Sequence, residues 1–342
     1  QLIELGDESL GIKVQLLAKG AAIFGIQTPD SQGLWSDLAA GPESVEGFLA
    51  NEACFGATCG RFANRISGGQ FSLDGVLHQL ECNCGPNSLH GGGAPFHQRI
   101  WELLDVQEVD GISVAATFAL NSADGEGGYP GNLRATATYR VGPNELSVRY
   151  SAKTDAATVV NLTNHVYWNL SGDHNEAVNG HELQLASTRY HAIDPNHLIC
   201  AQPSSVVGTV FDFSKGAYLS QGLDDESGEL VELMGYDHAF LIEGRGPRLG
   251  AKLGHRGSGR SVEIWTDQPA IHLYTGGYIS EAPAGKGGSV LKGFCGVALE
   301  SENLPDAPNQ PDFPSAILRP GETYQHEIRW RFDCHFDGFH QG

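Results

Sequence analysis

The residue best suited to chemistry in this sequence is Glu300, which follows a short apolar run at residues 296–299. A loop with four prolines comes next, between residues 305 and 314, and proline restricts the backbone of such a loop. A carboxylate held where a strand meets a rigid loop, and partly removed from water, has a raised pKa and suits general-base catalysis. The alternative is a solvated surface acid, which is where most Glu side chains lie.

His165 is the second candidate and lies in the segment NLTNHVYWNLSG, residues 161–172. An unperturbed imidazole has a pKa near ~6.5, so it can donate or accept a proton around neutral pH. Tyr167 and Trp168 follow it, and asparagines surround it. Aromatic rings that cover C–H faces beside amides that bind hydroxyls are typical of a sugar site. Core packing is the alternative for His165 and for both aromatic side chains.

The segment GRFANR at residues 60–65 places Arg61 and Arg65 on either side of Asn64. Glycine lets the backbone approach a ligand closely, and Arg and Asn side chains can donate to hydroxyl oxygens. These features predict that Arg61 and Asn64 bind substrate.

Two further polar residues lie next to loops. His90 precedes three glycines, residues 91–93, which cannot form a stable helix. Asp237 comes just before the apolar run at residues 239–242, and a carboxylate can accept from two sugar hydroxyls. The alternatives are a histidine in a flexible turn and an Asx-type turn that leads into a strand.

The elements that position these residues are predicted to be strands. Residues 112–153 alternate apolar and polar side chains through three runs, which indicates an antiparallel meander with one solvated face. Residues 324–332 give a last alternating strand, and residues 70–80 give a hairpin around Asp-Gly. Residues 229–234 form a short helical turn at most. The fold class predicted is all-β, a large antiparallel sandwich, with residues 1–342 as a single domain.

Acidic side chains outnumber basic ones, 41 to 21, for a formal net charge of -20. Such a surface repels nucleic acid and anionic lipid and disfavours a phosphorylated substrate. Solubility alone also accounts for the acidity. No apolar run reaches the ~18 residues that span a bilayer. We therefore expect no nucleic-acid partner and no membrane partner.

The seven cysteines show no zinc-knuckle spacing, since only one residue separates Cys82 from Cys84. The glycines at residues 285–288 lack the P-loop spacing, so we expect neither a metal nor a nucleotide cofactor. Unpatterned cysteines are typical of free thiols in a reducing compartment. No signal peptide is visible, so a cytoplasmic location is expected, and a signal removed before residue 1 stays open. Four other histidines are expected to be ordinary surface or loop residues: His97, His174, His181 and His191.

Taken in order, the motifs resemble those of the aldose 1-epimerase family, the galactose mutarotases. The matching segments cover most of the chain and are GRFANR at residues 60–65, NSLHGG at 87–92, NLTNH at 161–165, YDH at 236–238, and ALE at 298–300 running into PDA at 305–307. The resemblance implies a large β-sandwich of the galactose mutarotase type with an open sugar cleft. It also implies that aldohexoses such as galactose and glucose are converted between their α and β anomers, without a cofactor or a metal.

The resemblance assigns roles to individual residues. Glu300 matches the general base and His165 the general acid, while Arg61, His90 and Asp237 match the residues that hold the sugar. The chain departs from many relatives at one position, because Glu302 stands where they carry Gln. A second carboxylate there would raise the pKa of the base or alter the recognition of hydroxyls.

Three other functions compete with this one. A sugar-binding module without catalysis would not need both Glu300 and His165. An epimerase of hexose 6-phosphates would need a basic cluster, which the acidic composition disfavours. A glycoside-cleaving enzyme could use Glu300 and Asp237 as its two carboxylates, but His165 would then have no role. A monomer or a homodimer is expected.

Overall fold

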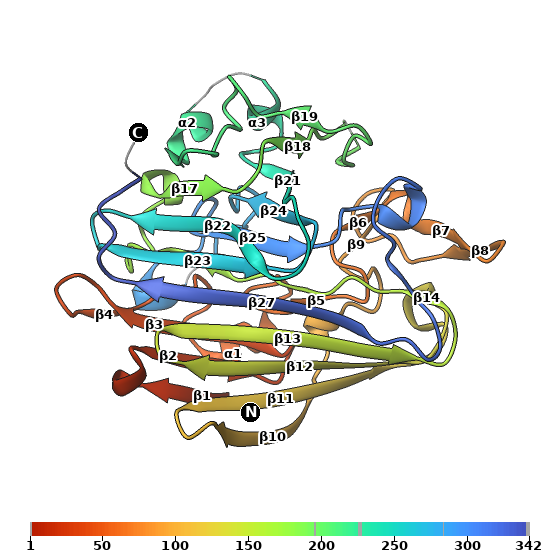
Figure 1. Cartoon of the computed structure of the whole chain (residues 1–342), viewed down its shortest axis with the longest axis horizontal. Helices are drawn as coiled ribbons and strands as arrows, with labels where there is room; N and C mark the ends of the chain where they lie inside the picture. Colours follow the sequence, from red (N-terminus) through yellow and green to blue (C-terminus); the bar gives the residue numbers. More distant parts are fainter. Residues whose placement is uncertain (1, 195, 225–227, 283, 340–342) are drawn as a thin grey trace.

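The computed structural model describes residues 2–194, 196–224, 228–282 and 284–339. Its strands form two facing layers (Figure 1). One layer is an antiparallel nine-stranded sheet, in the spatial order β10 (Glu102–Val109), β11 (Ser113–Ser122), β12 (Leu133–Gly142), β13 (Glu145–Thr154), β27 (Tyr324–Asp333), β23 (Arg260–Thr266), β22 (Arg248–His255), β17 (Glu182–Leu185) and β20 (Ala217–Tyr218).

The opposite layer contains two sheets. The six-stranded sheet has the order β16 (Tyr167–Trp168), β25 (Val297–Glu302), β24 (Ala270–Tyr274), β21 (Asp237–Leu241), β18 (Arg189–His191) and β19 (Ser204–Ser205). The four-stranded sheet has the order β1 (Leu2–Asp7), β2 (Ile12–Leu17), β3 (Ala22–Pro29) and β4 (Trp35–Asp37). Short strand pairs complete the fold: β5 (Thr58–Cys59) with β15 (Thr163–Asn164), β6 (Arg65–Ile66) with β9 (Ser88–Leu89), β7 (Gln70–Leu73) with β8 (Val76–Gln79), and β14 (Thr158–Val159) with β26 (Ile317–Leu318).

The helices are short. The α-helices are α1 (Val45–Ala50), α2 (Ser220–Leu223) and α3 (Glu229–Glu232). The 3-10 turns are η1 (Glu8–Leu10), η2 (Ser67–Gly69), η3 (Phe96–Gln98), η4 (Glu126–Gly128), η5 (Val178–Gly180), η6 (Lys286–Gly288) and η7 (Ala307–Asn309). Within the described ranges, none of the helices has the length and apolar character needed to cross a membrane.

Alternation in the sequence explains how the layers pack. On β13 and β27 every second residue is buried, and Val148 pairs with Ile328 and Leu146 with Trp330 in register. These side chains belong to a core cluster that also includes residues of β2, β24 and β25 from the opposite layer. Each fully buried side chain of this kind contributes about 1.5–3 kcal/mol to folding. The predicted all-β sandwich is confirmed.

Several predicted elements have the expected position. The meander at residues 112–153 is β11, β12 and β13, and the last alternating strand is β27. The hairpin at residues 70–80 is β7 and β8, with Asp74 and Gly75 at φ values of 51° and 81°. Positive φ at both turn residues is what a two-residue hairpin turn requires. Helix α3 is the short turn expected at residues 229–234.

Strand β25 corrects one expectation. Its pairing with β24 continues to Glu302, opposite Ala270, so Glu300 lies within the strand rather than at its end. Successive side chains on a strand point to opposite faces. Val297 and Leu299 therefore enter the core between the layers, and Glu300 and Glu302 point to the other face of the six-stranded sheet.

Candidate active site

A cavity of about 370 Å³ lies over the face of the six-stranded sheet that carries Glu300. Segments far apart in sequence form its walls: Ala53, Cys54, Asn64, Arg65, Cys84, Leu89, His90, His165, Tyr167, His197, Asp237, His272, Tyr274, Tyr278 and Glu300. A concave site of this size with a few convergent polar groups suits a small molecule such as a monosaccharide. Five of the predicted site residues line this cavity, and they are Asn64, His90, His165, Asp237 and Glu300.

Glu300 and His165 face each other in the cavity as an acid–base pair. His165 Nε2 lies 3.4 Å from Glu300 Oε1, and the two side chains are only 5% and 2% exposed. Burial, and then the neighbouring Glu302, raise the pKa of Glu300 well above its usual value. Burial lowers the pKa of His165. Both shifts favour a proton on Glu300 over a proton on His165, so a proton can pass from one residue to the other through a bound molecule.

His165 is held through its backbone and by two neighbouring rings. Its N–H donates to the carbonyl of Ala57, and its own carbonyl accepts from Gly56. The ring centroid lies 4.7 Å from that of Tyr167 and 5.5 Å from that of His90. The short pair β5–β15, next to His165, attaches this segment to the loop that follows α1. The imidazole therefore has a fixed orientation toward Glu300.

His90 is a neutral hydrogen-bonding group. Its Nδ1 accepts from the backbone N–H of Asn64 at 3.1 Å, so the ring hydrogen is on Nε2. Burial lowers its pKa to about 3. The glycine after it has a clear structural reason, because Gly91 has a φ of 99° and a Cβ there would meet the carbonyl oxygen of Gly60 at 2.0 Å. The close approach of these two loops places His90 in the cavity wall.

Asp237 is an ionised carboxylate. His272 Nε2 donates to its Oδ1 at 2.7 Å, and Arg65 lies 3.4 Å from its Oδ2. Burial opposes ionisation, but Arg65 and His272 outweigh it and hold the pKa of Asp237 well below its usual range. Strand β24 pairs with β21 on one side and with β25 on the other. The side chain of His272 on β24 therefore lies between Asp237 on β21 and the strand that carries Glu300.

Arg61 is a correction to the predicted site. It is 1% exposed and lies outside the cavity lining. Its guanidinium donates to acceptors in neighbouring loops, namely Pro130, Gly131, Thr158, Ser122 and Ala123. These contacts join the loop before β12 to the start of β14, so Arg61 is a structural residue. Arg65, the second arginine of the same motif, is the one that reaches the cavity.

Glu302 lies behind the cavity lining. Asn64 Nδ2 donates to its Oε1 at 3.1 Å, and His272 Nδ1 is 4.0 Å from the same oxygen. The side chain is fully buried, and burial raises its pKa well above the usual value. Two carboxyl groups on the same face of β25 therefore influence each other's protonation.

Several cavity residues were missed from the sequence. His272 stands in the run AIHLY at residues 270–274, where alternation alone would have placed it on one face of a strand with Tyr274. Tyr167 lines the cavity, whereas Trp168 points into the core, as alternation on β16 requires. The four histidines expected to be surface or loop residues are all buried, which corrects the surface part of that prediction: His97, His174, His181 and His191.

Comparison with known proteins agrees with this fold. The family model described as aldose 1-epimerase matches residues 1–331. The chain is 38% identical to the galactose mutarotase of Homo sapiens over 322 residues, 94% of this chain and 91% of the human one. It is 35% identical to the aldose 1-epimerase of Escherichia coli K12 over 328 residues, 94% of this chain and 92% of the bacterial one.

Solved structures give the same result. An aldose epimerase homologue from C. elegans matches with a TM-score of 0.88 and 31% identity, over 98% of this chain and 99% of that one. The galactose 1-epimerase of Lactobacillus acidophilus matches with a TM-score of 0.85 and 26% identity, over 97% and 94%. The protein is thus a mutarotase-type β-sandwich. It belongs to the aldose 1-epimerase family, and this membership supports anomer interconversion of aldoses.

Proposed function

We propose that this chain interconverts the α and β anomers of aldohexoses such as galactose and glucose, with Glu300 as general base and His165 as general acid. The observation that carries the proposal is the 3.4 Å separation of the two groups inside one cavity. Anomer exchange opens the pyranose ring by removing a proton from O1 and delivering one to the ring oxygen. Both oxygens are bonded to C1, so the two groups must lie within a few ångströms of each other.

The reaction needs one proton shared between the two residues. Ring opening begins with ionised Glu300 and protonated His165, and it ends with protonated Glu300, neutral His165 and the open aldehyde. Rotation about C1–C2 then exposes the other face of the aldehyde, and closure returns both protons. Burial raises the pKa of Glu300 and lowers that of His165, which stabilises the state with the proton on Glu300 relative to the state with the proton on His165.

The remaining cavity residues suit recognition of a pyranose. Ionised Asp237 can accept from hydroxyls, while Arg65 and the Nε2–H of His90 can donate to them. Tyr167 and Tyr274 supply aromatic walls for the C–H faces of the ring. The ion pair between Arg65 and Asp237 argues against a phosphate site, because the arginine already has an anionic partner. It also argues against Asp237 as the second carboxylate of a glycosidase.

Polarimetry tests the proposal directly. Freshly dissolved α-D-galactose and α-D-glucose should reach their equilibrium rotation far faster with the enzyme than in buffer alone. A rate equal to the uncatalysed rate for both sugars, with sugar binding detected by calorimetry, would identify a binding protein and refute the proposal.

Arg65 and Arg61 form a matched pair for testing the assignment of sugar contacts. Arg65→Ala should raise KM for galactose about 10-fold or more, because a hydrogen bond to a charged group is worth about 1.5–3 kcal/mol. Arg61→Ala should leave the KM of the folded enzyme unchanged. It should lower the free energy of unfolding by about 3 kcal/mol or more, since several buried acceptors lose their donor. Urea unfolding and polarimetry on both variants check this, and an increase of KM in Arg61→Ala alone would reverse the assignment.

Glu302→Gln tests the influence of the second carboxyl group. The charge of Glu302 raises the pKa of Glu300, so its removal should lower that pKa. Because the base works only when unprotonated, the acid limb of the kcat profile should move to lower pH. The pH dependence of polarimetric rates measures this. An acid limb that does not move would mean that Glu302 stays protonated whenever Glu300 acts.

We also propose that residues 1–342 form one domain, that the protein is a monomer or a homodimer, and that it is cytoplasmic. The main core cluster supports a single domain, because it contains both Ile3 and Phe332. Cysteines present as free thiols support a reducing compartment. A single domain should give coincident unfolding transitions by two probes. Sedimentation equilibrium tests the oligomeric state, and cell fractionation tests the location.

A further inference from the structure

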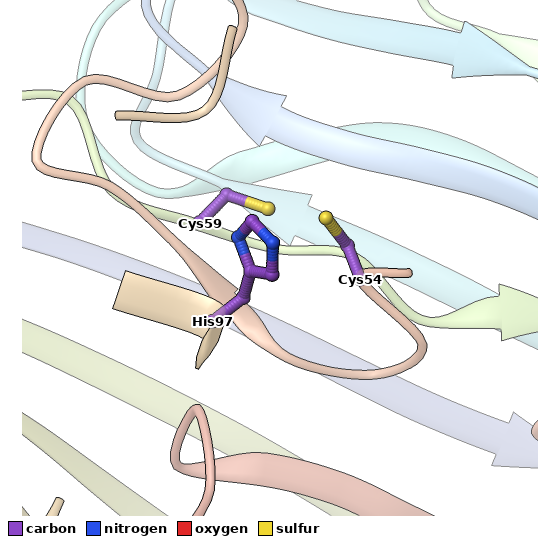
Figure 2. Close-up of side chains that lie close together, drawn as sticks. All are labelled: Cys54, Cys59 and His97. Atoms are coloured by element: carbon purple, nitrogen blue, oxygen red, sulfur yellow. The ribbon is translucent and has the colours of Figure 1, made fainter. Parts of the chain in front are cut away.

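Three potential metal ligands lie together beside the active site (Figure 2). The ligand atoms of Cys54, Cys59 and His97 are all within 4.8 Å of one another. Two ligands of one tetrahedral Zn²⁺ lie about 3.3–3.8 Å apart, given bonds of about 2.0–2.3 Å. Small side-chain rotations would therefore bring all three atoms to bonding distance. Figure 2 shows the Cys59 sulfur next to the His97 ring and the Cys54 sulfur turned toward the same point.

The group lies on a fixed part of the fold. Cys59 is on β5 and fully buried, and His97 in η3 is 8% exposed. The backbone N–H of Phe96 donates to the carbonyl of Gly60 at 3.0 Å, which ties η3 to the end of β5. Within the described structure, His97 Nδ1 is buried with no hydrogen-bond partner. A buried ring nitrogen without a partner is costly unless a ligand occupies it.

The same group adjoins the proposed base. Cys59 Sγ also lies within 4.8 Å of ligand atoms of His90 and Glu300. Cys54 is half-buried and lines the sugar cavity, so it opens the group to solvent. An ion held by the two sulfurs and His97 would have the Glu300 carboxylate within reach as a further ligand.

We propose that Cys54, Cys59 and His97 form a site for a thiophilic divalent cation such as Zn²⁺, and that the bound ion inhibits the enzyme. Thiolate and imidazole ligands select zinc over magnesium and calcium, which prefer oxygen. Binding releases the protons of the two thiols. The cation engages the carboxylate of Glu300, which can then no longer accept the O1 proton. The inhibition, though not the binding, rests on the function proposed above.

Cobalt binding tests the site without any use of activity. Untagged, reduced, metal-free protein titrated with Co²⁺ should show a thiolate-to-metal charge-transfer absorption that saturates at one equivalent and is displaced by Zn²⁺. His97→Asn should weaken Zn²⁺ affinity about 100-fold or more, since even partners of metal ligands are worth 10- to 100-fold. Cys54→Ser, in a half-exposed loop, provides a second ligand variant should His97→Asn fold poorly.

The matched control is Cys334→Ser, because Asp333, Cys334 and His335 form another group of close ligand atoms at the surface. This variant should bind Co²⁺ like the parent chain. No charge-transfer absorption in the parent, an absorption unchanged in both His97→Asn and Cys54→Ser, or one lost in Cys334→Ser would overturn the site.

Polarimetry with added Zn²⁺ tests the inhibition. Saturating Zn²⁺ should slow mutarotation about 100-fold, the lower end of the effect of losing one general base, and a chelator should restore the rate. His97→Asn should keep its metal-free rate and be insensitive to Zn²⁺ at the same concentration. Zn²⁺ bound at this site with an unchanged rate would refute inhibition while leaving the site intact. A parent chain that is inactive without metal would instead refute the proposed function.

Discussion

Glu300→Gln is expected to lower kcat for mutarotation by about 10² to 10⁴, the usual contribution of one positioned general base. The amide has nearly the same shape as the carboxylate but cannot accept the O1 proton. Glu300 lies within β25 and is paired through its backbone with β24, so the strand should keep its register. Sugar binding should therefore survive, because Arg65, His90 and Asp237 are unchanged.

The variant needs two measurements and a matched control. Polarimetry with α-D-galactose gives the rate, and calorimetry with the same sugar gives the affinity. Glu108→Gln makes the same chemical change on the exposed strand β10 and should leave both quantities unchanged. A Glu300→Gln enzyme as fast as the parent chain would remove Glu300 as the base.

The strands with one solvated face could be predicted, because the burial of each side chain determines whether that position is apolar or polar. On β13 and β27 one face is buried in the core and the other faces solvent, so apolar and polar side chains alternate. Strand β25 was harder to delimit. All six of its residues are buried, including Glu300 and Glu302, so it lacks the alternation that marks a half-solvated strand.

Individual side-chain directions in loops could not be predicted. Arg61 and Arg65 lie four residues apart in one motif, and their chemistry is the same. Which of them reaches the cavity depends on the backbone path between them, where Asn64 adopts a φ of 64°. His97 was likewise expected to be a surface or loop residue. Its burial depends on contact between η3 and β5, which are more than 35 residues apart in the chain. Such contacts are set by tertiary packing and leave no local signal.

His165→Asn is expected to lower kcat by about 10² to 10⁴ as well, since it removes the imidazole that faces Glu300 and is proposed to protonate the ring oxygen. Within the described cavity lining, His90 is the nearest histidine ring to His165, at 5.5 Å between centroids. His90 cannot replace it, because burial lowers its pKa to about 3 and its Nδ1 already accepts from Asn64. Polarimetry should show the loss, and calorimetry should show that galactose still binds.

Chemical rescue separates an acid role from a packing role. His165→Ala would leave a gap beside the rings of Tyr167 and His90, which contact His165 in the parent chain. Imidazole added to the buffer can enter this gap and donate the missing proton, so it should restore part of the rate. It should not restore Glu300→Gln, because that variant still has its acid and lacks the base. If imidazole raised both rates equally, or neither, the ring at residue 165 would be needed for shape alone and the proton would have to come from another group.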